Sequence, residues 1–175
     1  RLVMTKTRHV LLAGDGADQF GREMAVDLVG QEYFSTAAAR RRWEKSKAKE
    51  GDDKSKQGSK LAFPKETYLG TVGCVALDRF GNIAAGTSTG GLSNKKYGRI
   101  GDSPIVGAGT YADNRTCGVS CTGIGEHYIR NAIAYDISAQ MKYTKCTVQQ
   151  AVATSINKTL KPGYGGIIAL DREGN

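Results

Sequence analysis

The chain has 175 residues, of which 39% are hydrophobic, and this length is sufficient for one domain with a sizeable core. No apolar run approaches the roughly 20 residues of a membrane-spanning helix, and the chain does not open with the apolar stretch of a signal peptide. The formal net charge of +8 is compatible with a nucleic-acid partner, so the position of the basic residues has to be considered.

The first 30 residues predict three elements. Residues 1–7 are typical of the end of a helix, and the apolar run 9–14, which ends at a glycine, predicts a short buried strand. Residues 17–29 carry apolar side chains at helical spacing and predict an amphipathic helix. After a turn, Ser35 or Thr36 is a candidate N-cap for a helix over 37–48.

A basic segment follows, with nine Lys or Arg and four Asp or Glu between residues 40 and 60, or +5 of the +8. Its only aromatic residue is Trp43, so no series of side chains is available to stack on bases. Apolar residues are absent from 51–60, which predicts disorder there. We interpret 40–69 as a charged, mobile linker rather than an RNA- or membrane-binding segment.

The stretch from Gly70 to Asp102 contains the most informative pattern in the sequence. Its apolar run 72–77, a glycine-containing turn at 79–82 and a second apolar run from Ile83 predict a β-hairpin. The glycine-rich loop 92–106 then contains Arg99 and Asp102. A guanidinium can hold a carboxylate and a carboxylate can hold an ammonium, so this pair suits a zwitterion, although a surface salt bridge across a turn has the same spacing.

Two further strands are predicted at 108–112 and 117–121, followed by Thr-Gly-Ile-Gly-Glu at 122–126 and a helix through Met141. A strand, a glycine turn and a helix start can direct several N–H groups toward an anion. Thr147 and Gln150 fit a capping box that opens a helix to about residue 159.

A final strand is predicted at 167–171. Residues 169–175 repeat the pattern of 76–82, a strand that runs into a hairpin turn, and the return strand is absent. We therefore expect the sequence to be a fragment.

Four cysteines lack both Cys-x-x-Cys spacing and the pattern of a secreted disulfide framework. We expect buried free thiols and a reducing compartment, with Cys117 and Cys121 on one face of a strand. With two histidines and no clustered carboxylates, we expect no zinc site.

Three blocks carry a resemblance to a known family: Gly-Thr-Val-Gly-Cys-Val-Ala-Leu-Asp at 70–78, Gly-Asn-Ile-Ala-Ala-Gly-Thr-Ser-Thr-Gly-Gly at 81–91, and Gly-Arg-Ile-Gly-Asp-Ser-Pro at 98–104. Together they resemble the plant-type L-asparaginase/isoaspartyl peptidase family of N-terminal-nucleophile (Ntn) hydrolases, and the likeness runs from Val10 to Asn175. Members of this family are inactive precursors that cut themselves at a Gly-Thr bond, here Gly70–Thr71.

The resemblance implies a role for each matching residue. Thr71 is the nucleophile, and its α-amine, once freed by cleavage, is the base, because the ordinary pKa of an α-amino group is about 7.7–8.0. Thr89 tunes the nucleophile, and Thr122 with the Gly123 backbone forms the oxyanion hole. The remaining substrate-binding residues are Arg99 for the α-carboxylate, Asp102 for the α-amine, and Gly91 and Gly125.

The resemblance also implies the rest of the protein. The fold is α+β, a four-layer αββα sandwich in one domain, in which 1–70 ends the first (α) subunit and 71–175 forms most of the second (β) subunit. The substrates are L-asparagine and β-aspartyl dipeptides, and the assembly is a homodimer of α/β protomers in the cytoplasm, without nucleic-acid or membrane partners. The chemistry requires no cofactor, and a structural sodium belongs to a loop upstream of Arg1.

Four other functions compete with this interpretation. A glycosylasparaginase-like amidase shares the 98–104 block but typically has Asp-Thr at the junction, and taspase-type proteases depart from the Arg–Asp loop that is intact here. A catalytically inactive scaffold would not require the full set of site residues. A basic RNA-binding module would show a steep salt dependence of binding.

Overall fold

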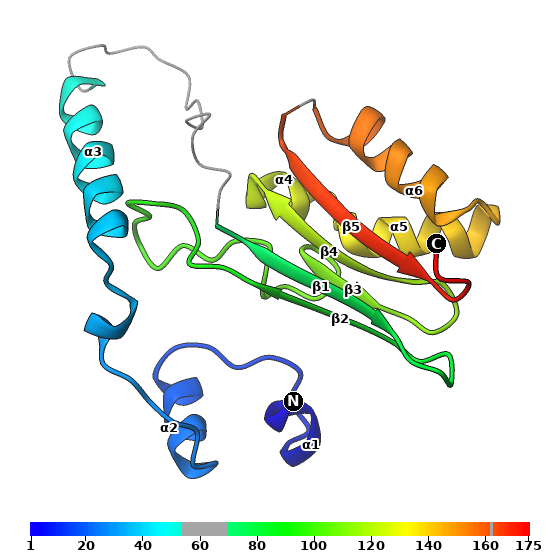
Figure 1. Cartoon of the computed structure of the whole chain (residues 1–175), viewed down its shortest axis with the longest axis horizontal. Helices are drawn as coiled ribbons and strands as arrows, with labels where there is room; N and C mark the ends of the chain where they lie inside the picture. Colours follow the sequence, from blue (N-terminus) through cyan, green and yellow to red (C-terminus); the bar gives the residue numbers. More distant parts are fainter. Residues whose placement is uncertain (54–69, 162) are drawn as a thin grey trace. The chain divides into compact units, whose positions relative to one another are not determined.

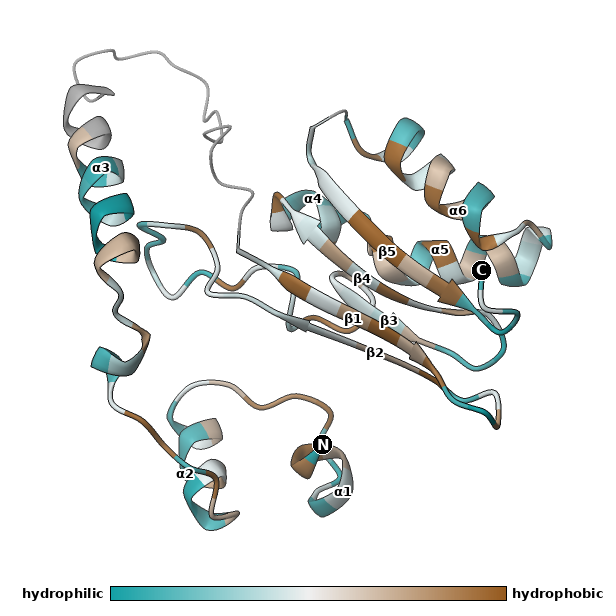
Figure 2. Ribbon diagram, viewed as in Figure 1, coloured by the Kyte–Doolittle hydropathy of each residue, from teal (hydrophilic) through white to brown (hydrophobic). Residues whose placement is uncertain are grey.

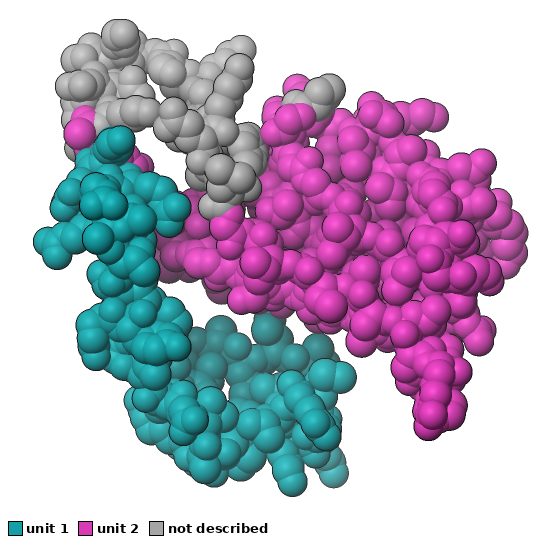
Figure 3. Space-filling view, viewed as in Figure 1, with its two compact units in different colours: residues 1–45 teal, residues 46–175 magenta. Residues whose placement is uncertain are grey.

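The computed structural model describes residues 1–53, 70–161 and 163–175, with the backbone alone at 49–53 (Figure 1). The protein has a mixed α+β architecture and divides into two compact units, Arg1–Lys45 and Ser46–Asn175 (Figure 3). Within the described ranges no helix is both long and apolar enough to cross a membrane.

The first unit contains short helices: α1 (Leu2–Lys6), α2 (Asp15–Glu23), the 3₁₀ helix η1 (Gln31–Phe34) and the start of α3 (Ala37–Asp53). The predicted strand at 9–14 is wrong. This segment has no regular structure, and Val10 is 74% exposed. A strand needs a hydrogen-bonded neighbour, and no described segment pairs with this one.

Both longer helices of this unit differ in length from the sequence prediction. Helix α2 stops at Glu23 rather than at residue 29, because Ala25 adopts a left-handed conformation with a φ of 52°. The predicted Thr36 cap of α3 is confirmed, since the Ala39 N–H donates to Thr36 Oγ1 at 3.1 Å. Helix α3 continues to Asp53, past its predicted end, and so includes the start of the segment expected to be disordered. Residues 54–69 of the predicted linker lie outside the described residues.

The second unit contains two antiparallel sheets packed face to face. The predicted hairpin is confirmed as β1 (Val72–Leu77) and β2 (Ile83–Ser88), and the larger sheet has the order β3 (Thr110–Ala112), β4 (Cys117–Gly123), β5 (Gly165–Asp171). Helices α4 (Gly125–Arg130), α5 (Ile133–Thr144) and α6 (Val148–Thr154) contact the larger sheet on its other face (Figure 1). A π-helix, η3 (Ser155–Thr159), continues α6. The unit therefore has a helical layer, a larger sheet and a smaller sheet.

Strand β4 contributes to both faces of the larger sheet. Cys117, Val119 and Cys121 alternate along it and are buried in one cluster with Ile133 and Ile137 of α5. Figure 2 shows hydrophobic residues along β4, β5 and α5, the elements that enclose this cluster. The buried free thiols expected at 117 and 121 are confirmed, and burial raises the pKa of Cys117 to about 11.

The other two cysteines are less enclosed. Cys74 is an exposed free thiol, against the expectation of burial, because it lies on the face of β1 that points away from the larger sheet. Cys146 is a half-buried free thiol.

The predicted helix through Met141 is two helices instead of one. Ala132, between α4 and α5, has a φ of 46°, and this left-handed residue breaks the helix. The break turns the first amides of α5 toward the loop before β3: the Ala134 and Tyr135 N–H groups donate to the carbonyls of Ala108 and Gly107 at 3.2 and 2.8 Å. These tertiary hydrogen bonds outweigh the local preference for a continuous helix.

The repeated sequence pattern gives a repeated turn. Asp78 Oδ1 accepts the backbone N–H groups found two and four residues later, both at 2.8 Å. Asp171 Oδ1 accepts the equivalent pair at 3.0 and 2.9 Å. In each case the carboxylate organises the turn that follows a strand.

The turn of the hairpin is also tied to the larger sheet. Asn114, in the loop between β3 and β4, accepts the Ile83 N–H at 2.8 Å, and its amide donates to Asn82 Oδ1 at 3.0 Å. The two sheets are thus connected at the end where β1 turns into β2.

The capping box at Thr147 gives a test of the fold. The Gln150 N–H donates to Thr147 Oγ1 at 3.3 Å, and the Thr147 N–H donates to Gln150 Oε1 at 3.0 Å. We expect Thr147→Ala to lower the free energy of unfolding by about 1 kcal/mol, because the Gln150 N–H loses its side-chain acceptor. Thr147→Ser keeps the acceptor and should lie close to wild type in urea denaturation. Equal stability of the Ala and Ser variants would contradict the capping role.

Candidate active site

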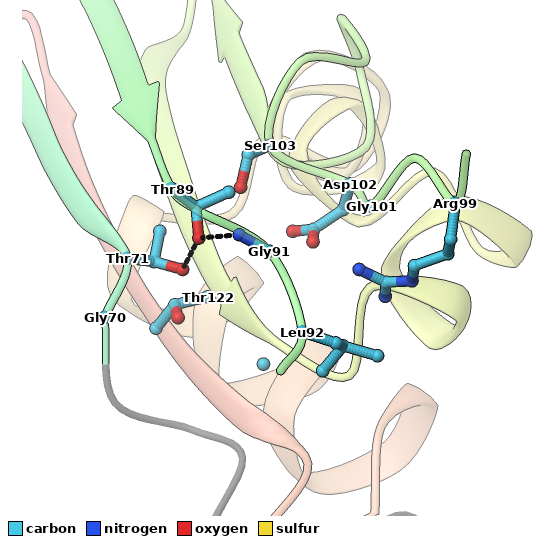
Figure 4. A pocket seen from close by; sticks show the side chains of 11 residues that line it. Gly70, Thr71, Thr89, Gly91, Leu92, Arg99, Gly101, Asp102, Ser103 and Thr122 are labelled. Atoms are coloured by element: carbon cyan, nitrogen blue, oxygen red, sulfur yellow. Dashed lines mark hydrogen bonds between the residues drawn. The ribbon is translucent and has the colours of Figure 1, made fainter. Parts of the chain in front are cut away.

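The hairpin brings two threonine hydroxyls together. Its register pairs Val72 with Ser88, so Thr71 and Thr89 lie opposite each other one step further along the two strands. Thr71 Oγ1 donates to Thr89 Oγ1 at 3.1 Å, and the Gly91 N–H donates to the same Thr89 oxygen at 3.1 Å (Figure 4). Thr89 therefore fixes the position of the Thr71 hydroxyl and accepts its hydrogen bond.

A pocket opens beside this pair. Its walls come from the start of β1, the end of β2, the loop that follows β2 and the end of β4 (Figure 4). It is lined by Gly70, Thr71, Thr89, Gly91, Leu92, Arg99, Gly101, Asp102, Ser103, Thr122 and Gly123. Hydroxyl groups, the Arg99 guanidinium and the Asp102 carboxylate thus line one small polar pocket. We call Thr71, Thr89 and Thr122 the pocket threonines.

Arg99 is held by an acidic residue on α4. Its Nε and Nη2 atoms donate to the two carboxylate oxygens of Glu126 at 2.8 and 2.9 Å, and both side chains are partly buried. The hydrogen bonds from Arg99 lower the pKa of Glu126. This bidentate geometry fixes the plane of the guanidinium. The ion pair of Arg99 is therefore with Glu126, and the alternative of a surface Arg99–Asp102 salt bridge is not observed.

Asp102 is a buried carboxylate whose capacity to accept hydrogen bonds is incompletely used. It is 5% exposed, and its Oδ2 has no hydrogen-bond partner among the described residues. Burial raises the pKa of Asp102, and the positive charge of Arg99 only partly opposes this shift. The carboxylate is enclosed by backbone, since a Cβ built on Gly125 would lie 2.8 Å from its Oδ1 and one on Gly109 would lie 2.8 Å from its Oδ2.

All the site residues expected from the sequence lie in one place. Eight of them line the pocket, and Gly125 lies directly behind Arg99 and Asp102. Leu92, Gly101 and Ser103 also line the pocket and were not singled out from the sequence. Gly101 and Ser103 flank Asp102 in the 98–104 block, which is the signal that could have found them.

The comparison with known families is consistent with this geometry. A family model described as asparaginase matches residues 1–175. The chain belongs to the asparaginase family. The resemblance to the isoaspartyl peptidase/L-asparaginase group of Ntn hydrolases, drawn from the three sequence blocks, is confirmed.

Members of the asparaginase family from bacteria and animals align with the whole chain. It is 45% identical over 178 residues to the isoaspartyl peptidase of Salmonella typhimurium, an alignment that covers 100% of the chain and 56% of that protein. It is also 45% identical over 179 residues to the isoaspartyl peptidase of Escherichia coli, an alignment that covers 100% of the chain and 54% of that protein. It is 40% identical over 177 residues to the isoaspartyl peptidase/L-asparaginase of Mus musculus, covering 100% of the chain and 52% of that protein. The chain thus spans about half the length of these curated relatives.

Glu126 is a further residue of this asparaginase-family site that the sequence analysis did not identify. It follows the glycine turn at the end of β4, and it is 27 residues from Arg99. The available signal was chemical: an arginine in a glycine-rich loop near a buried aspartate needs a second carboxylate to fix its plane. Among the described residues, the pocket included, no group of three or more His, Cys, Asp or Glu side chains is arranged to hold a metal ion.

The opposite environments of two aspartates give a stability test. Burial raises the pKa of Asp102, so its ionised form costs stability at pH 7, and Asp102→Asn should raise the free energy of unfolding there. That gain should vanish at a pH below the ordinary aspartate range, where Asp102 is protonated in both the folded and the unfolded chain.

Asp113 is the matched control for this test. Hydrogen bonds from Arg115 lower the pKa of Asp113 to about 2, so Asp113→Asn should be destabilising at pH 7, with the loss shrinking as the pH falls from about 4 toward 2. Urea denaturation at pH 7 and at a pH below the ordinary aspartate range measures the effect of each substitution. Destabilisation by Asp102→Asn at pH 7 would contradict the cost of burying this carboxylate.

Proposed function

We propose that the full-length protein is a self-cleaving threonine hydrolase that converts L-asparagine to L-aspartate and ammonia and cleaves β-aspartyl dipeptides. The observation that carries this proposal is the Thr71–Thr89 hydroxyl contact at the Gly70–Thr71 junction, in the same pocket as Arg99 and Asp102. The names of the relatives, isoaspartyl peptidase and isoaspartyl peptidase/L-asparaginase, support the same substrate class.

Cleavage of the Gly70–Thr71 bond creates the base. In the uncut chain the nitrogen of Thr71 is an amide and has no basicity. Hydrolysis frees an α-amine whose ordinary pKa is about 7.7–8.0, near the working pH and on the same residue as the hydroxyl. Thr89, which accepts the hydrogen bond of Thr71, orients the nucleophilic oxygen.

The reaction then proceeds in two steps. Thr71 Oγ1 attacks the side-chain carbonyl of the substrate, the α-amine takes the hydroxyl proton and passes it to the leaving amine, and an ester to Thr71 remains. Water attacks the ester and releases aspartate. The Thr122 hydroxyl and the Gly123 N–H are the donors that we assign to the oxyanion of each tetrahedral intermediate.

Substrate binding follows from charge and donor count. Arg99 has five N–H donors and uses two of them on Glu126, which leaves three for a carboxylate. Asp102 is a carboxylate that lines the same pocket, and its negative charge suits an ammonium group. A zwitterionic aspartyl unit satisfies both side chains, and its side-chain amide extends toward Thr71.

The wider organisation is proposed on the same family basis. We infer the four-layer αββα sandwich, the α and β subunits divided at Gly70–Thr71, and a homodimer of these protomers. The four free cysteines support a reducing location, for which we propose the cytoplasm. We propose no cofactor for the chemistry. The structural sodium stays a prediction for the region upstream of Arg1.

Replacement of the nucleophile tests the proposal. We expect the full-length protein to appear as two pieces by intact mass, the second beginning with Thr71, and Thr71→Ala to remain one chain with hydrolysis reduced by about 10³-fold or more. Thr71→Ser keeps a hydroxyl and should still be cut. A folded wild-type protein that stays whole, or a Thr71→Ala variant that is cut like wild type, would refute self-activation.

A conservative change at Arg99 tests the binding mode. Arg99→Lys keeps the charge and removes the fork that holds Glu126 and the substrate carboxylate together. We expect KM for L-asparagine to rise about 10- to 100-fold, the loss of one charge-assisted hydrogen-bond pair, while kcat changes less. Arg115→Lys, on the Asp113 pair in the loop before β4, is the control and should leave KM unchanged. Equal KM values for the Arg99 and Arg115 variants would exclude the assigned role.

A further inference from the structure

A second row of residues lies behind the pocket threonines. Each member is two positions further into the strand: Gly73 on β1, Thr87 on β2 and Ser120 on β4. Because side chains in a strand alternate between faces, residues two apart share a face, so this row lies on the same inner faces as the threonines. Gly73 and Thr87 are also directly paired in the β1–β2 ladder.

Two members of this row form a hydroxyl pair between the sheets. Thr87 Oγ1 and Ser120 Oγ are 2.6 Å apart, and Thr87 Oγ1 also donates to the Gly109 carbonyl at 3.1 Å. A hydroxyl has one proton, so Thr87, which gives its proton to Gly109, must accept the proton of Ser120. The chain of hydrogen bonds therefore runs from Ser120 through Thr87 to the Gly109 carbonyl. Ser120 is 3% exposed, which excludes water as an easy replacement.

The third member, Gly73, leaves room for this pair. A Cβ built on Gly73 would collide with the Ser120 hydroxyl. The close approach of β1 to β4 at this point therefore requires glycine, and it brings the start of β1 near the strand that carries Thr122.

The far end of the hydrogen-bond chain reaches the substrate-binding side of the pocket. Gly109 packs against Asp102 so closely that a Cβ there would lie 2.5 Å from the Asp102 carbonyl oxygen. The Gly109 carbonyl also accepts the Cys121 N–H at 2.9 Å, which ties it to β4. One network thus joins β2, which leads into Thr89, with β4, which carries Thr122, and with the backbone against Asp102.

We propose that the Thr87–Ser120 hydroxyl pair is a positioning device that sets Thr71 and Thr89 at the correct distance from Thr122. This inference rests on the proposed function, because it concerns the rate of the same hydrolysis. The pair acts through the strands and does not touch the substrate. A displacement of about 1 Å in a reacting group can cost on the order of 10²-fold in rate. A network that fixes the two sheets beside the nucleophile can therefore have a large effect on kcat.

The decisive variant is Thr87→Val in the full-length protein, since it removes the hydroxyl and keeps the branched shape. We expect kcat to fall at least tenfold and self-cleavage to slow, while KM stays within about threefold. KM is preserved because the Cys121 N–H still holds the Gly109 carbonyl, and with it Asp102. Thr87→Ser restores the hydroxyl and should recover kcat to within about threefold of wild type.

A second buried hydroxyl pair provides the matched control. Thr116 Oγ1 and Ser138 Oγ are also 2.6 Å apart and buried, but this pair joins the residue before β4 to α5, roughly 20 Å along the strand from Thr122. Thr116→Val loses an equivalent interaction away from the pocket. It should lower the unfolding temperature as Thr87→Val does and leave kcat and self-cleavage unchanged.

The outcomes separate this inference from the proposed function. If wild type is active and Thr87→Val matches the kcat of Thr116→Val, the positioning role is refuted while the hydrolase remains. If folded wild type neither cuts itself nor hydrolyses the substrates, the proposed function itself fails.

A variant that cannot be obtained folded does not end the test. If Thr87→Val does not fold, Ser120→Ala, which removes only one oxygen, must show the same selective loss of kcat. Where both single variants fold, the loss of kcat in the double variant Thr87→Val/Ser120→Ala should be no larger than in Thr87→Val alone. Full additivity of the two losses would mean that the hydroxyls do not act as one unit.

Discussion

The register of the β1–β2 ladder is the constraint on which the site depends. Side chains alternate along a strand, so a slip of one residue would turn Thr71 and Thr89 to opposite faces of the sheet and separate their hydroxyls. The register is fixed by local chemistry at the turn, where the Asp78 carboxylate binds the backbone amides of the loop. A hairpin turn distant from the pocket thereby determines whether the Thr71 and Thr89 hydroxyls meet.

Electrostatics divides the pocket into a fixed and an unsatisfied half. Arg99 is neutralised and oriented by Glu126, so it presents a rigid set of donors. Asp102 carries the opposite character, a buried carboxylate with an oxygen that no described residue bonds. Burying this charge costs free energy in the folded state, and under the proposed function the ammonium group of the substrate would offset part of that cost.

Local features were predictable from sequence, and tertiary ones were not. The hairpin and the capping box at Thr147 follow from turn and cap residues, whereas the pocket residues are predicted only through the family resemblance. The Arg99–Glu126 and Thr87–Ser120 contacts join residues 27 and 33 positions apart, and nothing in their spacing indicates them. The run 9–14 resembled a strand but lacks a described neighbour. The break between α4 and α5 arises from hydrogen bonds to a distant loop, which local helix propensity cannot anticipate.

The Asn82–Asn114 contact and the Thr87–Ser120 pair both connect the two sheets, but at different places. One connects the two sheets at the hairpin turn and the other connects them beside the pocket. Two surfaces pinned at separated points can neither slide nor rotate against each other, so the sheets form a rigid frame. The pocket threonines are therefore held by a frame that is fixed at both ends. Under the proposed function, the substrate has to fit this arrangement, because neither the two sheets nor the Arg99 guanidinium held by Glu126 is free to follow it.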